Sequence, residues 1–404
     1  LKNHSALQLF PGDVAFKLYD TYGFPLDLTE DILRDYKISL DTEAFSTLME
    51  AQREKARQSW SGSGDSKTEA IWYALEQKVP ATLFIGYEQE TAEAKTVALV
   101  CEGEHVDALR AGQKGYVILD QTPFYAEGGG QVGDQGVLFA PGHQAHVINT
   151  TKIGSLFLHY VEILEGMFTV GMQLEAVVDR ERRQQLRCNH SATHLLHAAL
   201  RKRFGPGVMQ KGSLVGPNHL RFDFSYSKPL TLEDIHFLEQ EVNRCVQDNT
   251  STLIETKNPE QAFSEGAIGL FGEKYTDQVR VVKIGDGQES SYSHELCGGT
   301  HVRQTGEIGC FKIIDQSSVA AGVRRLEAVT GQQAILWIQK QEHQLRTVAD
   351  LLKSAPSELD SKIRMLLTHR KELEKAVQDQ KQKKDKAQVP THTHKNTFAG
   401  VNVY

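Results

Sequence analysis

Cysteine is scarce in this chain, and long apolar segments are missing from it. Five cysteines are scattered over 404 residues without a paired spacing, and an odd number does not suit a disulfide framework. This usage favours a reducing cytosol, so we expect a cytoplasmic protein. No apolar run approaches the length of about 18 residues that suggests a membrane-spanning helix, and no signal peptide is recognisable. We therefore expect neither a membrane nor a secreted location.

An excess of positive charge is also missing. The formal net charge is -7, which argues against a globally basic nucleic-acid binder. Local basic stretches such as Arg201–Arg203 leave RNA binding open. A chain of this length with 40% hydrophobic residues can form two or three domains with cores. It begins with Leu1 and ends in what reads as the opening of a strand, so we expect a piece of a longer polypeptide.

Hydrophobic periodicity predicts an α+β protein of several domains. Residues 71–178 contain short runs rich in Val, Ile, Thr and Phe between glycine turns, which predicts a small β-barrel or sandwich. Helical and strand-like segments are mixed in the part that follows. The predicted parts are helices at 1–60, a polar linker at 61–70, the barrel at 71–178, an α+β domain at 179–331, a helical hairpin or coiled coil at 332–390, and the start of another domain at 391–404.

The predicted helical arm near the C-terminus carries an apolar repeat. Leu359, Ile363, Leu366, Leu373 and Val377 keep a spacing near 3.5 residues, which is typical of helices that pair. The partner is either the preceding helix of the same chain or a second subunit. The second interpretation predicts a homo-oligomer that forms through the C-terminal region.

Two short motifs have the same spacing and point to a metal. His190-Ser-Ala-Thr-His194 and Cys297-Gly-Gly-Thr-His301 each place two metal-binding side chains four positions apart. The first motif lies in a predicted helix between Asp179, a suitable N-cap, and Gly205, a suitable C-terminal residue, so its two histidines share a face. A lone pair of histidines is more often ordinary, but a matching Cys/His pair supplies the ligands that zinc prefers. We predict one zinc site formed by His190, His194, Cys297 and His301.

The role of this zinc is open at the level of sequence. Four protein ligands describe a closed, structural site, whereas a catalytic zinc keeps a position for water or substrate. The metal either shapes the pocket or contacts the substrate or a water molecule, and we favour the second interpretation. His197 is a further candidate on the same helix face.

Several stretches closely resemble the alanyl-tRNA synthetase family of the bacterial and organellar type. They are Phe16–Pro25, Phe124–Gly133, the two metal motifs, Gln210–Ser213 and Ala320–Arg325. The resemblance implies the end of the tRNA-recognition helices, a barrel with a glycine motif, a zinc-bearing editing domain and the first part of the C-terminal region. It places the ATP- and Mg²⁺-dependent aminoacylation core upstream of this chain. It implies that this portion hydrolyses Ser-tRNA(Ala) and Gly-tRNA(Ala), with tRNA(Ala) as partner.

The resemblance also implies roles for individual residues, and each has a plainer alternative. Gln210 and Ser213 resemble pocket residues of the family but could be ordinary turn groups. Thr193 could hydrogen-bond a serine hydroxyl or merely its own helix carbonyl. Arg324 could hold a terminal phosphate or ribose, or form a surface ion pair. Gly129 and Gly130 allow a close approach of backbone to RNA or to a ligand, or form a tight turn.

Two other functions remain open. One is a free-standing deacylase that acts on mischarged tRNA, against which the helices at 1–60 argue. The other is a tRNA-binding module whose zinc is purely structural.

Overall fold

The computed structural model describes most of the chain, and its residues fall into two compact units, Leu1–Tyr73 and Ala74–Tyr404. The described residues are 9–22, 29, 33, 38–42, 44–49, 65–269, 277–285, 292–387, 396–398 and 401–403. Within these ranges no helix is long and apolar enough to cross a bilayer. All five cysteines are free, which agrees with the expectation of no disulfide framework.

The first unit contains a parallel strand pair and helix. Strands β1 (Leu9–Phe10) and β2 (Ser39–Leu40) pair next to α1 (Gly12–Tyr22). The linker predicted at 61–70 is not extended throughout, because α4 (Asp65–Glu76) already begins inside it. The sequence suggested a loop there because Gly and Ser cluster at 61–64, but the residues that follow are good helix formers.

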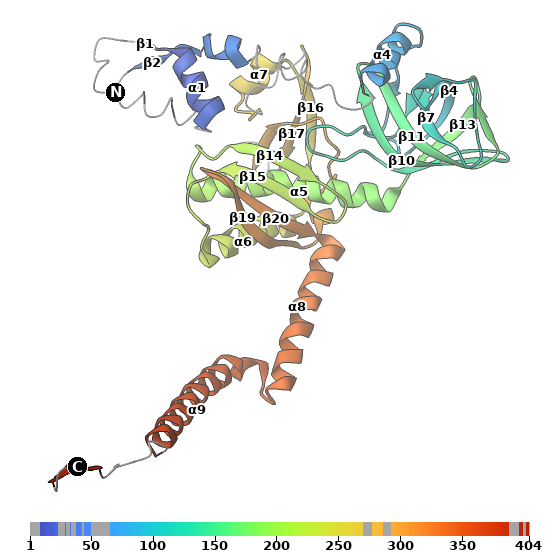
Figure 1. Ribbon diagram of the computed structural model, residues 1–404. Helices are drawn as coiled ribbons and strands as arrows, with labels where there is room; N and C mark the ends of the chain where they lie inside the picture. The colour runs from blue at the N-terminus through green and yellow to red at the C-terminus, as the bar shows by residue number, and fades with distance from the viewer. Residues whose placement is uncertain are drawn as a thin grey trace. The chain divides into compact units, whose positions relative to one another are not determined.

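The second unit begins with a closed β-barrel, as predicted for residues 71–178 (Figure 1). Six strands follow the order β13-β9-β10-β11-β7-β4, and β13 pairs with β4 to close the ring. Their alternating burial matches the period of a strand with one face inward. The six are β4 (Thr91–Cys101), β7 (Lys114–Leu119), β9 (Gly136–Ala140), β10 (His143–Ile153), β11 (Leu156–Glu165) and β13 (Gln173–Val178).

Short strands complete the barrel region. They are β3 (Leu83–Phe84) with β8 (Gln121–Thr122), β6 (Ala108–Arg110) with β12 (Met167–Thr169), and β5 (Glu104–His105) on the edge of β4.

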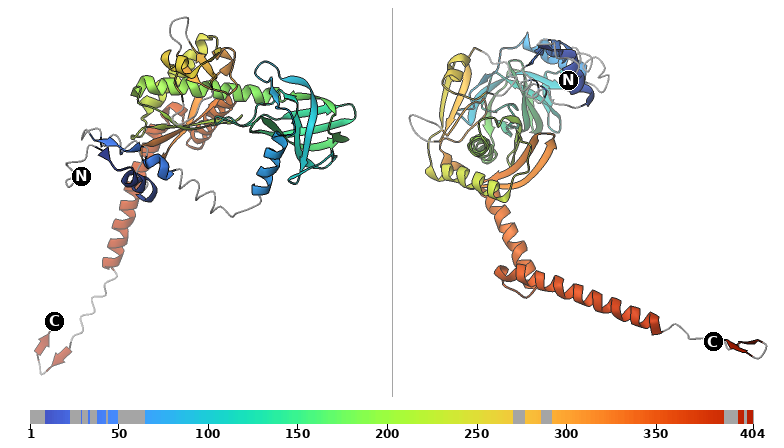
Figure 2. Two further views of the ribbon diagram at one scale, coloured as in Figure 1. Left: turned by 90° about the horizontal axis from the view of Figure 1, so that it is seen from above. Right: turned by 90° about the vertical axis from the view of Figure 1, so that its left-hand side faces the viewer.

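Helix α5 (Arg180–Phe204) leads from the barrel into an α+β domain (Figures 1 and 2). It begins and ends where predicted: Asp179 accepts a hydrogen bond from the Arg182 amide at 3.1 Å, and Gly205 follows with a φ of 97°. Together with α6 (Leu232–Asp248) it packs on a four-stranded antiparallel sheet. That sheet has the order β14 (Gln210–Val215), β15 (Leu220–Ser225), β20 (Val323–Thr330) and β19 (Phe311–Ala320).

A second, smaller sheet completes this domain. It has the order β16 (Leu253–Lys257), β17 (Val279–Ile284) and β18 (Ser293–Leu296). The helix α7 (Pro259–Ser264) lies between β16 and β17, and the 3₁₀ turn η1 (Thr305–Ile308) lies between β18 and β19. One apolar core, which includes Leu196, Phe222, Phe224 and Leu326, joins α5, α6 and the four-stranded sheet.

Two helices follow the domain, in the region where the sequence predicted a helical hairpin or coiled coil. They are α8 (Gly331–Leu351) and α9 (Leu359–Ala387), separated by the 3₁₀ turn η2 (Pro356–Glu358). Apolar side chains on both remain exposed, including Leu345, Leu366 and Leu373. Many of the apolar side chains along these two helices are therefore exposed to solvent. The short strands β21 (Asn396–Phe398) and β22 (Val401–Val403) pair near the C-terminus.

A buried ion pair joins the barrel to α5. Arg183 is fully buried and binds Asp134 through Nε, at 2.9 Å from Oδ2, and through Nη2. Its Nη1 and Nη2 also donate to the carbonyl oxygens of Gly86 and Pro123, each at 2.7 Å. The Asp134 carboxylate in turn accepts from the Tyr125 amide. This network fixes the first turn of α5 against the barrel.

We expect Arg183→Met to lower the free energy of unfolding by about 3–5 kcal/mol, because it leaves the Asp134 charge buried without its partner. Urea unfolding followed by circular dichroism measures the loss. The double variant Arg183→Met/Asp134→Leu should regain part of it. Arg180→Ala, which removes an exposed ion pair to Glu90, is the control and should cost less than about 1 kcal/mol. Equal losses for the two single variants would contradict the role assigned to Arg183.

Candidate metal centre

The four predicted metal ligands lie together. One ligand atom each from His190, His194, Cys297 and His301 can be chosen so that all four lie within 4.8 Å of one another. The histidines of α5 lie one turn apart, as an i, i+4 pair must. Cys297 and His301 flank a turn that follows β18. Cys297 Sγ lies 3.4 Å from Nε2 of both His190 and His301.

These separations fit a zinc ion. With zinc bonds of about 2.0–2.3 Å, neighbouring ligand atoms of a tetrahedron lie about 3.3–3.8 Å apart. His194 Nε2 is buried and has no hydrogen-bond partner among the described residues, as an atom directed at a metal would be. The donor set of three imidazoles and one thiol is also the type that zinc prefers. The residues therefore fit the metal that the sequence predicted.

The other ring nitrogen of each histidine is already engaged. Nδ1 of His190 lies 2.7 Å from Gln131 Oε1, and Nδ1 of His301 lies 3.2 Å from Ser191 Oγ. Nδ1 of His194 lies 2.9 Å from Glu295 Oε2. Such outer partners fix the tautomer and the ring orientation of a metal ligand. Nε2 of all three rings is thereby left for the centre of the cluster.

The electrostatics of the cluster favour a cation. Burial raises the pKa of the Cys297 thiol, but its interactions with the neighbouring histidines outweigh burial and lower the pKa well below its usual range. Burial lowers the pKa of His301 to about 3, so this ring is a neutral ligand. At His194 burial acts in the same direction, but Glu295 and Cys297 raise the pKa to about 10. Metal binding at His194 therefore displaces a proton.

The turn that carries Cys297 is held from two sides. Arg280 donates to the carbonyl oxygens of Cys297 and Gly299 at 3.0 and 2.6 Å. The Tyr87 hydroxyl donates to the carbonyl of Gly298 at 2.6 Å. A Cβ at Gly299 would lie 2.0 Å from His190 Cε1, so only glycine lets the turn approach this ring.

The barrel contributes Gln131, a residue that sequence reasoning missed. Its side chain is fully buried, and its Oε1 accepts from the Thr300 amide at 3.0 Å besides contacting His190. Gln131 directly follows Gly129 and Gly130, whose φ angles of 58° and 83° are those of a type I′ turn. Gly128 and Gln131 close this turn with two backbone hydrogen bonds. The glycine motif is thus a hairpin turn that delivers Gln131 to a metal ligand.

The predicted pocket residues Gln210 and Ser213 are also neighbours of this turn. Gln210 Nε2 donates to Ser213 Oγ at 3.2 Å. A Cβ at Gly130 would lie 2.4 Å from Ser213 Oγ, so the turn and β14 are in close contact. The Val215 amide donates to the Gly130 carbonyl at 2.7 Å. Barrel and sheet therefore meet at this point.

Two other predicted residues have different surroundings. Thr193 is buried, and its hydroxyl donates to the Asn189 carbonyl at 2.8 Å, which is its plainer alternative. Arg324 lies opposite Phe224 on the sheet, and Phe224 lies opposite Gln210, so the three share one row. The ion pair considered for Arg324 is formed instead by its neighbour Arg325, which binds Asp223 with two hydrogen bonds.

Glu295 is the second residue that the sequence did not reveal. Its side chain is buried, and its second oxygen, Oε1, lies 3.0 Å from His197 Nδ1. Burial raises the pKa of this carboxyl group, but His194 and His197 outweigh it and hold the pKa below its usual range. His197, the further candidate ligand, thus lies beside the cluster. It binds Glu295, which in turn binds the predicted ligand His194.

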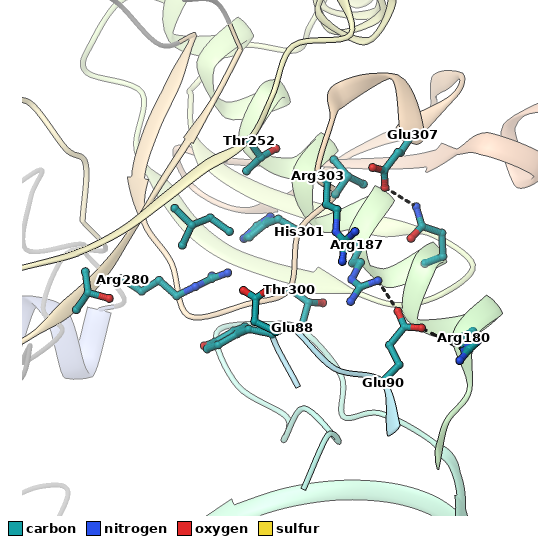
Figure 3. Close-up of a pocket in the computed structure, with 15 residues that line it drawn as sticks. Glu88, Glu90, Arg180, Arg187, Thr252, Arg280, Thr300, His301, Arg303 and Glu307 are labelled. Atoms are coloured by element: carbon teal, nitrogen blue, oxygen red, sulfur yellow. Dashed lines mark hydrogen bonds and ion pairs between the residues drawn. The ribbon is translucent and has the colours of Figure 1, made fainter. Parts of the chain in front are cut away.

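A cleft of about 810 Å³ borders the cluster at His301 (Figure 3). Four arginines line it, and Glu90 binds two of them, Arg180 and Arg187. Arg280 is engaged with the Cys297 turn. Arg303 is exposed and directed into the cleft.

Comparison with known proteins agrees with the resemblance. Residues 1–182 match the family described as tRNA synthetases class II (A), and residues 279–327 match the threonyl and alanyl tRNA synthetase second additional domain. The chain is 48% identical to an alanine–tRNA ligase of Granulibacter bethesdensis over 93% of its own length and 43% of the relative. It is 48% identical to that of Parvibaculum lavamentivorans over 91% of its length and 42% of the relative. The chain thus spans less than half of these relatives.

We expect one zinc per chain, and we expect the double variant His190→Ala/His194→Ala to lose it, because two of four ligands are removed. Elemental analysis of the purified protein measures the content. His236→Ala/His343→Ala, which changes two exposed histidines, is the matched control. Full zinc occupancy in the first variant would show that the assignment is wrong.

We expect Gln131→Leu to weaken zinc binding by about 10- to 100-fold, because His190 loses the partner that orients its ring. Competition with a chromophoric chelator measures the affinity. Gln135→Leu is the control, since Gln135 lies in the same segment but binds the Ile148 carbonyl. Unchanged zinc affinity in Gln131→Leu would show that the barrel does not contribute to the metal centre.

Proposed function

This chain belongs to the alanyl-tRNA synthetase family, and we propose that it holds the editing activity of such an enzyme. The reaction is hydrolysis of serine or glycine wrongly esterified to tRNA(Ala), next to the ATP-dependent alanylation that the whole protein performs. The observation that carries this proposal is the cluster of His190, His194, Cys297 and His301, of which Cys297 and His301 lie in the segment that matches the second additional domain of these synthetases.

There is a physical reason why such an enzyme needs a hydrolytic site in addition to the site that attaches alanine. A pocket for alanine can exclude neither a smaller side chain nor one that adds only a hydroxyl group, since such differences are worth about 1–3 kcal/mol. An aminoacyl ester is already activated. The site therefore needs to position water and the carbonyl group, and it needs no covalent nucleophile.

The side chains of the cluster provide the means. A zinc ion held there supplies polarisation of the ester carbonyl or an anchor for the substrate amine. Gln210 and Ser213, linked at 3.2 Å, form one side of the site in this proposal. Thr193 lies next to His194 and contributes to the site in this proposal. Its hydroxyl group donates its hydrogen bond to the Asn189 carbonyl. Hydrolysis requires no ATP.

The RNA end has three candidate contacts. The arginine-lined cleft reaches His301 and offers Arg303 to a phosphate. Arg324 stays a candidate for a phosphate or ribose contact, and Gly129 and Gly130 stay candidates for a close backbone approach. We propose that single-stranded RNA enters along the cleft, because a guanidinium group there lies near a metal ligand.

Assembly and location are further parts of the proposal. The exposed apolar residues of α8 and α9 support association of the C-terminal region with another subunit. The free cysteines support a reducing, cytoplasmic setting.

A tRNA-binding module with a structural zinc is the second candidate. The observation in its favour is that four protein ligands converge, which is the coordination of a structural site. A free-standing deacylase has no observation that favours it over part of a synthetase.

We expect the protein to hydrolyse Ser-tRNA(Ala) and Gly-tRNA(Ala) while sparing Ala-tRNA(Ala). Cys297→Ala should lower the rate on the serine ester by at least about 100-fold, because a metal ligand that supports carbonyl polarisation is lost. Release of labelled amino acid measures the rate. Cys310→Ala, a half-buried cysteine outside the cluster, is the control. A folded Cys297→Ala variant with the full rate would favour the structural zinc, and an inactive wild type would refute the proposal.

A further inference from the structure

A small cavity is lined by Glu295, the carboxylate that binds the predicted metal ligand His194. It has a volume of about 210 Å³ and lies between α5, the segment leading into β14, and β18. Its wall includes His197, Arg201, Gln210 and Glu295, with Val208 and Leu296 as apolar members. Pockets for whole drug-sized ligands measure about 300–1,000 Å³. This cavity therefore suits a group of a few heavy atoms, such as a small amino-acid side chain.

Most polar groups in the wall are already satisfied. Arg201 donates to the carbonyl oxygens of Pro206 and Val208 at 2.6 and 3.1 Å. Glu295 binds His194 through one oxygen and His197 through the other. His197 Nε2 is different, because it is buried and has no hydrogen-bond partner in the described part of the chain. Buried nitrogen atoms of this kind normally have one.

The hydrogen bond to Glu295 determines what His197 can bind. A carboxylate oxygen only accepts, so the ring proton lies on His197 Nδ1. This nitrogen donates a hydrogen bond to Glu295 Oε1 at 3.0 Å. In the tautomer with its proton on Nδ1, Nε2 is an acceptor, and its ligand must be a donor. The apolar side of the cavity, formed by Val208 and Leu296, favours a neutral donor over a cation, since an ion loses more hydration there. A hydroxyl group meets both conditions.

We propose that His197 Nε2 accepts a hydrogen bond from the side-chain hydroxyl of a serine ester bound in this cavity, and that His197 is a specificity-determining residue. This inference rests on the proposed editing function. Glu295 is the positioning residue, since it orients His197. Alanine presents a methyl group that cannot donate, so its ester would leave Nε2 buried and unpaired. A site built in this way rejects the analogue that lacks the hydroxyl.

The inference adds His197 to the contact with a serine hydroxyl that the sequence suggested for Thr193. The Thr193 hydroxyl donates to the Asn189 carbonyl at 2.8 Å, so it has no proton left for the substrate. It can only accept. His197 adds an acceptor that is not shared with the helix backbone.

The test compares binding of three non-hydrolysable probes, the seryl, alanyl and glycyl amides of 3′-amino-3′-deoxyadenosine, to the zinc-loaded full chain by calorimetry. We expect the wild type to bind the seryl probe about 10- to 100-fold more tightly than the alanyl probe. His197→Asn keeps a donor for Glu295 but removes Nε2, so it should abolish this preference. His197→Gln can place a carbonyl oxygen near the position of Nε2 and should restore part of it.

Zinc content separates this role from a structural one. Both His197 variants should keep one zinc per chain, since Glu295 still holds His194. His159→Asn changes a fully buried histidine in the barrel and should leave the seryl preference unchanged. A seryl preference that persists in His197→Asn would overturn the inference, and so would loss of zinc in both His197 variants.

Deacylation of the three esters, measured in parallel, separates this failure from that of the proposed function. A wild type that hydrolyses the serine ester while His197→Asn keeps the seryl preference would leave editing in place and refute His197 alone. A wild type that hydrolyses none of the esters would refute the editing function and the inference with it.

Discussion

The buried contact between Arg183 and Asp134 determines how the barrel meets α5, and the metal centre depends on that geometry. Arg183 precedes His190 by seven residues, which is about 10 Å or two turns along one helix. Asp134 follows Gln131 by three residues, and Gln131 contacts His190 at 2.7 Å. Helix α5 and the barrel segment 131–134 are thus joined twice. One contact is the ion pair of Arg183 with Asp134, and the other is the contact of His190 with Gln131. A buried ion pair contributes little net stability, but here it fixes the register in which the second contact forms.

Close approach of backbone is the second constraint on the site. Gly130 has a φ of 83°, and a Cβ there would meet Ser213, while a Cβ at Gly299 would meet His190. One glycine brings the barrel onto β14, and the other brings the Cys297 turn onto α5. Both positions therefore require glycine for a structural reason that does not depend on phosphate binding, because each allows two segments of the protein to approach within contact distance.

The sequence predicted the parts of the site that depend on local spacing. The helix at 180–204, its two caps and the i, i+4 histidines follow from periodicity, and the closed barrel was one of two predicted alternatives. Gln131 and Glu295 could not be found in this way, because they bind His190 and His197 across 59 and 98 residues of sequence. Nothing in the local pattern of a glutamine or a glutamate indicates such a contact. The start of α4 at Asp65 was missed because the neighbouring Gly and Ser residues dominated the local pattern.

Glu295 connects the metal centre with the recognition of a small side chain. If four protein ligands occupy the metal, the ion has little freedom to distinguish one amino acid from another, and selectivity must come from groups around it. One carboxylate that holds His194 with one oxygen and His197 with the other places a hydrogen-bond acceptor at a fixed position relative to the metal. The two tasks then differ physically. In the proposed function a metal held there would contact the ester group, which the serine, glycine and alanine esters share, whereas His197 Nε2 would bind the hydroxyl, which alanine lacks. Glycine lacks the hydroxyl as well, so the proposed hydrolysis of its ester does not follow from this hydrogen bond and rests on the resemblance to the family.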